Sequence, residues 1–109
     1  MAGKYILKGI GVSGGRVQGK VRIVSHTKSQ PSFHEGDILV TRITDPTMVS
    51  LMARSGAIVC AIGGMTSHPS ISSRELGIPC VVSAKNAMKK LQDGMHVIVD
   101  GTTGKIFKA

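Results

Sequence analysis

The chain has 109 residues, 41% of them hydrophobic and 18% charged, a composition typical of one globular domain and not of a disordered segment. Its 14 Lys and Arg residues against 6 Asp and Glu give a formal net charge of +8, which favours anionic partners. No apolar run reaches the roughly 20 residues of a membrane span, and with three aromatic residues, Tyr5, Phe33 and Phe107, the chain lacks stacking platforms for single-stranded nucleic acid.

The first residues, MAGKYILKG, lack the apolar stretch and cleavage site of a signal peptide, which predicts a cytoplasmic protein. YILKGI (residues 5–10) is apolar enough for a first strand that ends at Gly9. The glycines of GIGVSG (residues 9–14) match the spacing of a dinucleotide fingerprint, but they lead into RVQGKVRIV (residues 16–24), which has the pattern of a strand and not of a helix. We therefore predict a tight turn between two strands here, and no nucleotide site.

Residues 25–37 are polar and predict a loop, and DILVTRI (residues 37–43) predicts a strand. In the following TDPTMVSLMARSG, Asp45 is a candidate N-cap with a proline at the first helical position, and Gly56 is a candidate stop. We expect a short helix with its methionines turned inward. The apolar AIVCAI (residues 57–62) is then long enough for one strand.

The last third of the chain continues with short strands and one helix: PCVVS (79–83), the helix AKNAMKKLQDG (84–94) ending at Gly94, HVIVD (96–100), and TTGKIFK (102–108) as a turn and a last strand. Cys60 and Cys80 each lie in an apolar run, which predicts buried thiols in a reducing compartment. This order of elements predicts a single α/β domain over residues 1–109, with layered mixed sheets and two or three short helices.

Small and hydroxyl residues surround one histidine in GGMTSHPSISSRELGIP, residues 63–79. A helix is expected to begin near Ser67 or His68, because Pro69 suits a first turn and Gly77 suits a helix end. A helix start presents unpaired backbone N–H groups, which bind anions and phosphate above all.

The residues next to the histidine favour the same ligand. Gly63 and Gly64 let a ligand approach the backbone closely, and Thr66, Ser67 and Ser70 offer hydroxyl donors. A neutral imidazole beside bound phosphate can accept a phosphoryl group and pass it on, so His68 is a candidate nucleophile. The alternative is that the hydroxyls only cap the helix and that His68 is incidental. The other histidines, His26, His34 and His96, show no metal-binding spacing, and we predict no metal site.

The stretch GGMTSHPSISSRELGIPCVV resembles the phosphohistidine signature of the PEP-utilising enzymes, and the resemblance extends over essentially the whole chain. That family includes PEP synthase, pyruvate phosphate dikinase and enzyme I of the sugar phosphotransferase system. The resemblance implies the family's mobile domain, a three-layer β/β/α swivelling unit whose histidine carries a phosphoryl group between two sites.

By this resemblance His68 is the catalytic phosphoryl carrier. Gly63, Gly64, Thr66 and Ser67 would shape the phosphate pocket, and Thr66 is also a candidate site of regulatory phosphorylation. Arg74, with Glu75 beside it, would support the site mainly by anchoring the helix.

The resemblance also implies that this chain holds no cofactor. ATP, PEP and Mg²⁺ would be bound by ATP-grasp nucleotide-binding and PEP- or pyruvate-binding subunits or domains, so the chain would be a phosphotransferase component that cannot run the full reaction alone. Pro69 and Ala61 depart from the family pattern and favour an alternative, a non-catalytic binding or regulatory module that retains the fold. A third alternative is the small subunit of a split enzyme with the same fold, in which a serine matters instead.

Overall fold

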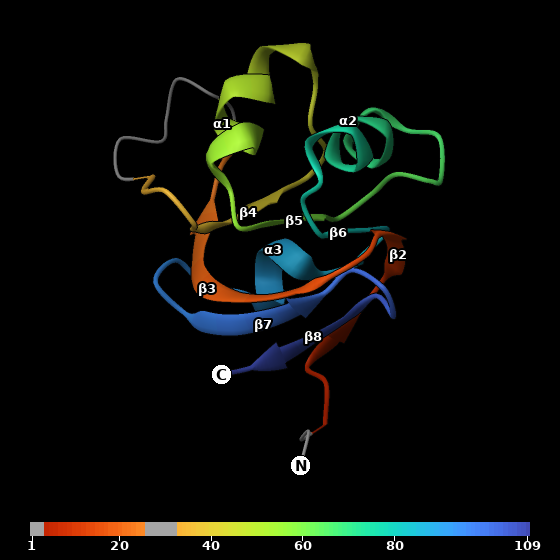
Figure 1. Ribbon diagram of the computed structural model, residues 1–109. Coiled ribbons are helices and arrows are strands. Elements are labelled where there is room, and N and C mark those ends of the chain that lie inside the picture. Colours follow the sequence, from red (N-terminus) through yellow and green to blue (C-terminus); the bar gives the residue numbers. More distant parts are fainter. Residues whose placement is uncertain (1–3, 26–32) are drawn as a thin grey trace.

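A computed structural model describes residues 4–25 and 33–109, arranged in three layers (Figure 1). The predictions for His26 and for the rest of the loop at 26–32 lie outside the described residues. The elements are β1 (Leu7–Lys8), β2 (Ile10–Ser13), β3 (Arg16–Ile23), β4 (Ile38–Thr41), a 3₁₀ turn (Pro46–Met48), α1 (Val49–Arg54), β5 (Ala57–Cys60), α2 (His68–Leu76), β6 (Cys80–Val82), α3 (Ala87–Lys90), β7 (His96–Asp100) and β8 (Lys105–Lys108).

Strand β3 bends and belongs to two sheets. Its first part, residues 16–20, pairs antiparallel with β7, and its last part, residues 21–23, pairs parallel with β4. The strand order within the described residues is β1-β8-β7-β3-β4-β5-β6-β2, and the β3 bend folds this order into two stacked sheets. Helices α1 and α2 cover the outer face of the sheet that contains β4, β5 and β6 (Figure 1). The predicted β/β/α class with mixed sheets and a few short helices is confirmed.

The central strands β4, β5 and β6 are buried on both faces, which explains their unbroken apolar sequences. Because side chains alternate along a strand, Val40, Val59 and Val81 point into the core between the two sheets. Their neighbours Leu39 and Ile58 point into a second core beneath the helices. Met48 and Met52 pack into this second core, as the inward methionines of the sequence predicted.

Cys60 and Cys80 are free thiols in the core beneath the helices, which confirms the prediction of buried cysteines. Burial raises the pKa of both thiols, that of Cys80 to about 11. Both therefore stay protonated and unreactive at neutral pH.

Of two predictions about glycines in the N-terminal half, one is confirmed and one is wrong. The first strand ends at Gly9 as predicted, although β1 covers only Leu7–Lys8, and β1 and β2 lie at opposite ends of the strand order. A side chain at Gly9 would place its Cβ 2.4 Å from the Val82 carbonyl oxygen, so only glycine fits where the chain crosses between sheets. The tight turn expected across residues 9–14 is wrong, because residues 10–13 form β2; Gly14 and Gly15, the second with a φ of +119°, connect β2 to β3.

Two helix ends also differ from prediction. Helix α1 ends at Arg54, and Gly56 is needed instead for a close approach, since its Cβ would lie 2.6 Å from the Gly36 carbonyl oxygen. The helix predicted over residues 84–94 is helical only at Ala87–Lys90. Leu91 is already extended and is 1% exposed in the core between the sheets. Burial of Leu91 therefore outweighs the helix propensity of the residues around it.

In the described part of the chain, each helix is too short or too polar to cross a membrane.

Because Ile58 is buried and Ile71 is exposed, replacing each by alanine should lower the stability of the fold by different amounts. Ile58→Ala removes a fully buried side chain beneath the helices and should lower the free energy of unfolding by about 2–5 kcal/mol. Ile71→Ala alters a side chain on α2 that is 47% exposed and should change it by no more than about 0.5 kcal/mol. Urea denaturation followed by circular dichroism measures both, and equal losses would contradict this account of the core.

Candidate functional site

His68 is the first residue of α2 and lies at the carboxyl edge of the parallel strands. Thr44 follows β4 at the same edge, and its Oγ1 is 2.8 Å from His68 Nδ1. Thr44 is only 3% exposed, so it holds the ring from the protein side. The other ring nitrogen, Nε2, is 3.3 Å from the Ser72 Oγ one turn further along the helix. The half-buried imidazole therefore has one nitrogen bonded to a buried hydroxyl and the other beside a partly exposed one.

The hydroxyls near the start of α2 bind the loop that precedes the helix. Ser67 Oγ donates to the Gly64 carbonyl at 2.8 Å and accepts from the Gly64 amide at 3.2 Å. Ser70 is fully buried and donates to the same carbonyl at 2.6 Å. The Ser67 side chain makes no capping bond to the helix amides. These two serines therefore fix the shape of the loop at residues 63–67, and Thr66 remains exposed on its surface.

The first turn of α2 offers fewer backbone donors than the sequence led us to expect. Pro69 has no N–H, and the amides of Ser70 and Ile71 both donate to the Ser67 carbonyl, at 3.0 and 3.1 Å. Unpaired amides are thus missing at these three positions. An anion beside His68 would have to find most of its donors elsewhere.

The glycine pair has two different structural roles. Gly63 has a φ of +126°, and a Cβ there would lie 2.9 Å from Ser67 Oγ, so the loop itself requires glycine. A Cβ at Gly64 would meet nothing within 4 Å. The packing of this chain does not require glycine at position 64, which fits the prediction that a ligand approaches there.

Arg74 anchors α2. Its Nε donates to the Val12 carbonyl at 2.7 Å and its Nη1 donates to the Met65 carbonyl at 2.9 Å. These bonds tie the last turn of the helix to β2 and to the loop before His68. The anchoring predicted for Arg74 is therefore visible in its contacts, while a role in holding phosphate stays a prediction.

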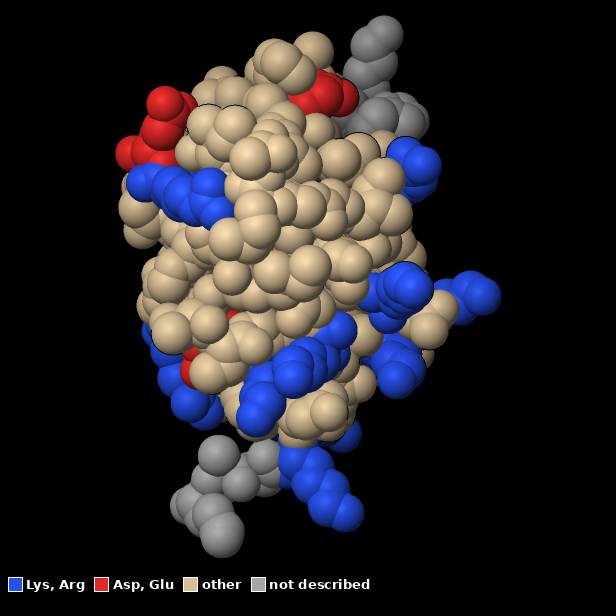
Figure 2. All heavy atoms as spheres, turned by 90° about the vertical axis from the view of Figure 1, so that its right-hand side faces the viewer, with Lys and Arg blue, Asp and Glu red and all other residues tan. Residues whose placement is uncertain are grey.

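Two apolar side chains are exposed close to His68 in the sequence. Met65 lies three residues before His68 and is 54% exposed, and Ile71 lies three residues after it and is 47% exposed. Figure 2 views the molecule from the side of α2 and β2, and Lys and Arg gather mainly in its lower half, away from α1 and α2. Asp45 is an acidic residue directly after Thr44, and it is the N-cap predicted from the sequence. Hydrogen bonds from the Thr47 hydroxyl and amide hold the pKa of Asp45 below its ordinary value.

Sequence reasoning missed Thr44 and Ser72. Thr44 follows the carboxyl end of a parallel strand, and ligands of parallel sheets bind at such ends. This position in the sequence could have identified Thr44 as a candidate site residue. Ser72 lies four residues after His68, so the two share one face of a helix. The described residues contain no cluster of three or more His, Cys, Asp or Glu side chains that could hold a metal ion.

Comparisons with known proteins point to one family. The sequence model described as "PEP-utilising enzyme, mobile domain" matches residues 33–104. A phosphoenolpyruvate synthase from Pyrococcus furiosus is 53% identical over 105 residues, which cover 96% of this chain but 13% of that protein. The chain thus spans about an eighth of the length of this relative.

Solved structures agree on the fold. The solution structure of the enzyme I protein nEIt matches with a TM-score of 0.59 and 30% identity, over 68% of this chain and 31% of that chain. Aconitase X from Thermococcus kodakaraensis matches with a TM-score of 0.75 over 94% of this chain and 97% of that chain. Because the second match is only 20% identical, it shows a shared fold and nothing of the chemistry.

Alanine at the two glycines should separate loop geometry from ligand access. Gly63→Ala forces a side chain into a left-handed conformation and against Ser67, and should lower the free energy of unfolding by about 1–3 kcal/mol. Gly64→Ala should leave it within about 0.5 kcal/mol of the unchanged protein. Urea denaturation of both variants checks this, and a Gly64→Ala variant as unstable as Gly63→Ala would show that the loop has been misassigned.

Proposed function

The chain belongs to the PEP-utilising enzyme mobile-domain family, and from that premise we propose that it is a phosphoryl carrier in which His68 is transiently phosphorylated. The observation that supports this most is the bond between His68 Nδ1 and the buried Thr44 hydroxyl. It fixes the orientation of the ring and leaves Nε2 on the more accessible side. A histidine nucleophile needs this arrangement, with one nitrogen held and the other available.

The proposed transfer uses Nε2 as the nucleophile. We assign the ring proton to Nδ1, which donates to Thr44 Oγ1, so that the lone pair is on Nε2. This lone pair forms a bond to the donor's phosphorus while the bond from phosphorus to the leaving oxygen breaks, and the oxygen departs with the electron pair. In the second step an oxygen of the acceptor attacks phosphorus, and the N–P electron pair returns to Nε2. The Nδ1 proton stays in place throughout.

Ser72 is placed to assist both states of the ring. Its Oγ lies 3.3 Å from Nε2, so its hydroxyl can donate to the free lone pair. Once Nε2 is phosphorylated, the same hydroxyl can turn to donate to a phosphoryl oxygen.

The charge of the phosphoryl group must be balanced largely by partners. Arg74 directs two of its donors to backbone carbonyls, and no unpaired amide is available at residues 69–71 of the first turn. Phosphoryl transfer depends chiefly on position and charge stabilisation. ATP, PEP and Mg²⁺ would accordingly be held by nucleotide-binding and PEP- or pyruvate-binding domains or subunits, and the exposed Met65 and Ile71 would contact them when His68 docks.

A non-catalytic binding module that keeps the fold is the second candidate. Pro69 and the internally bonded amides of Ser70 and Ile71 favour it, because they leave little in the chain to stabilise phosphohistidine. The two candidates differ in one observable, the covalent labelling of His68.

Labelling of three proteins should decide between the candidates. After incubation with PEP or ATP in a host extract, the unchanged protein should gain one phosphoryl adduct that is labile in acid and stable in alkali. His68→Ala should gain none. Thr44→Val should be labelled about fivefold more slowly, because loss of one hydrogen bond costs about 1 kcal/mol. Intact-mass spectrometry and ³¹P NMR provide the measurement.

The extract must phosphorylate a known relative in parallel. Under that control, an unlabelled protein would reject the carrier, and a labelled His68→Ala variant would show that another residue accepts the group.

Phosphorylation of the exposed Thr66 would place negative charge two residues before His68. The charge would repel an incoming phosphate donor, so we expect Thr66→Glu to slow labelling about fivefold, the effect of roughly 1 kcal/mol of repulsion at a surface. Thr66→Gln has the same size without the charge and should be labelled at the normal rate. Equal initial rates for the two variants would remove the case for charge-based regulation at this residue.

A further inference from the structure

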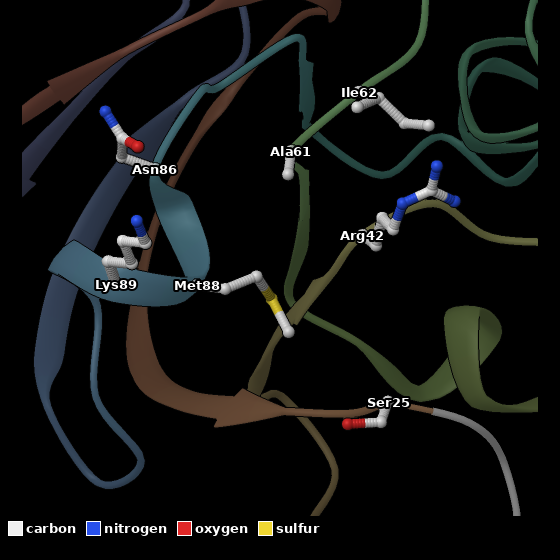
Figure 3. Close-up of a pocket in the computed structure, with 7 residues that line it drawn as sticks. All are labelled: Ser25, Arg42, Ala61, Ile62, Asn86, Met88 and Lys89. Atoms are coloured by element: carbon white, nitrogen blue, oxygen red, sulfur yellow. The ribbon is translucent and has the colours of Figure 1, made fainter.

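A second candidate site lies on the other side of the mixed sheet from α2. It is a pocket of about 470 Å³ at the carboxyl ends of β3, β4 and β5, beside α3 (Figure 3). Ser25 follows β3, Arg42 follows β4, and Ala61 and Ile62 follow β5. A volume of this size is within the usual range for small-molecule sites.

The pocket exists because the core between the sheets is left open at this edge. Along β4 the inward row of Ile38 and Val40 continues to Arg42. Along β5 the row of Ala57 and Val59 continues to Ala61. A charged side chain and a single methyl group therefore stand where larger apolar side chains would close the core.

The walls of the pocket combine apolar surface with positive charge. Ala61, Ile62 and Met88 supply the apolar part, and Ile62 is 40% exposed. Arg42 and Lys89 are both exposed and lie on opposite sides of the pocket, with the Met88 side chain between them (Figure 3). The ion pairs among the described residues join Arg16 to Asp100 and Arg22 to Asp37, so within that part of the chain neither Arg42 nor Lys89 forms an ion pair.

We propose that this pocket binds a small organic phosphate ester whose body is apolar or aromatic. The charged ends of Arg42 and Lys89 point away from each other on the two sides of Met88 (Figure 3), so they would favour a phosphate dianion over a carboxylate through the positive potential at the mouth of the pocket and not by both binding one phosphate. The Ser25 hydroxyl and the Asn86 amide, also on the wall, are further donors for phosphate oxygens. The apolar surface adds the preference for a ligand with a hydrophobic body over a free inorganic ion.

The segments after β4 and after β5 both help to build the His68 site. A ligand in this pocket would contact these two segments from the opposite face of the sheet. The Ile62 amide donates to the Arg42 carbonyl at 3.1 Å, and the Ala61 amide donates to the Thr41 carbonyl at 3.1 Å. The segment after β4 continues to Thr44, and the segment after β5 continues to Gly63. The inference does not depend on phosphorylation of His68, because it rests on side chains that the His68 site does not use.

Titration of the ¹⁵N-labelled chain by NMR tests the proposal with two probes, adenosine monophosphate and 1-naphthyl phosphate. We expect saturable shifts at the amides of Arg42, Ala61, Ile62 and Asn86 with at least one probe. Adenosine and inorganic phosphate each lack half of the recognised chemistry and should bind at least about tenfold more weakly. His68→Ala should bind the probes as the unchanged chain does, which separates this site from the carrier function.

Four variants identify the pocket residues. Arg42→Gln and Lys89→Gln change exposed side chains and should each weaken binding about fivefold or more. Ala61→Phe fills the pocket and should abolish the saturable shifts. Lys108→Gln removes a charge from β8, outside the pocket, and should have no effect. The amide spectrum of each variant also reports whether it is folded.

Two results would overturn the proposal. One is the absence of saturable shifts with both probes up to about 10 mM, where even a ligand with millimolar affinity would bind. The other is a set of chemical shift changes that are spread over the basic surface, disappear when salt is added and persist in Ala61→Phe. Such a result would show non-specific attraction of the probe to a chain of charge +8.

Discussion

Burial of β4, β5 and β6 on both faces is the constraint on which the rest of the structure depends. Three short parallel strands can be buried twice only if one layer covers each face, here the helices on one side and the antiparallel sheet on the other. The bend of β3 supplies the second sheet without a separate domain. Polar and charged groups are then excluded from the strands and collect where the strands end. Thr44, His68 and Arg42 all lie at that edge, so the location of chemistry in this molecule follows from its core.

The His68 site is rigid and self-contained in its loop, yet incomplete as a place for phosphate. The polar groups of Gly64, Ser67 and Ser70 bond mainly to one another, and Arg74 bonds to backbone carbonyls. This satisfies buried polar groups at the expense of ligand donors. Such a division suits a carrier that visits different partners, because strong stabilisation of phosphohistidine by its own chain would slow release to the acceptor.

Much of this fold could be predicted from the sequence, because the decisive features are local. The apolar runs of the central strands, the Asp45 cap and the Gly77 stop of α2 each depend on neighbouring residues alone. What failed depends on distant contacts. Residues 10–13 form a strand and not a turn because β2 pairs with the distant β6, and Leu91 leaves its helix for a core built by other strands. At the site the histidine and its glycines could be predicted from their motif, but Thr44 is brought to the ring by the parallel pairing of β4 and β5.

The same edge of the sheet carries two different environments because strand alternation sorts side chains to opposite faces. On the helix face the backbone turns into the Gly63 loop and His68, and the exposed side chains there include Met65 and Ile71. On the other face the inward rows end in Arg42 and Ala61, and the surface is concave and positive. The backbone between the two faces is shared and held by two hydrogen bonds. A ligand on the pocket face would therefore contact the Arg42 segment two residues before Thr44, whose hydroxyl is bonded to the ring on the other face. Any coupling between the two faces should run through these bonds, since the buried strands behind them are too closely packed to yield.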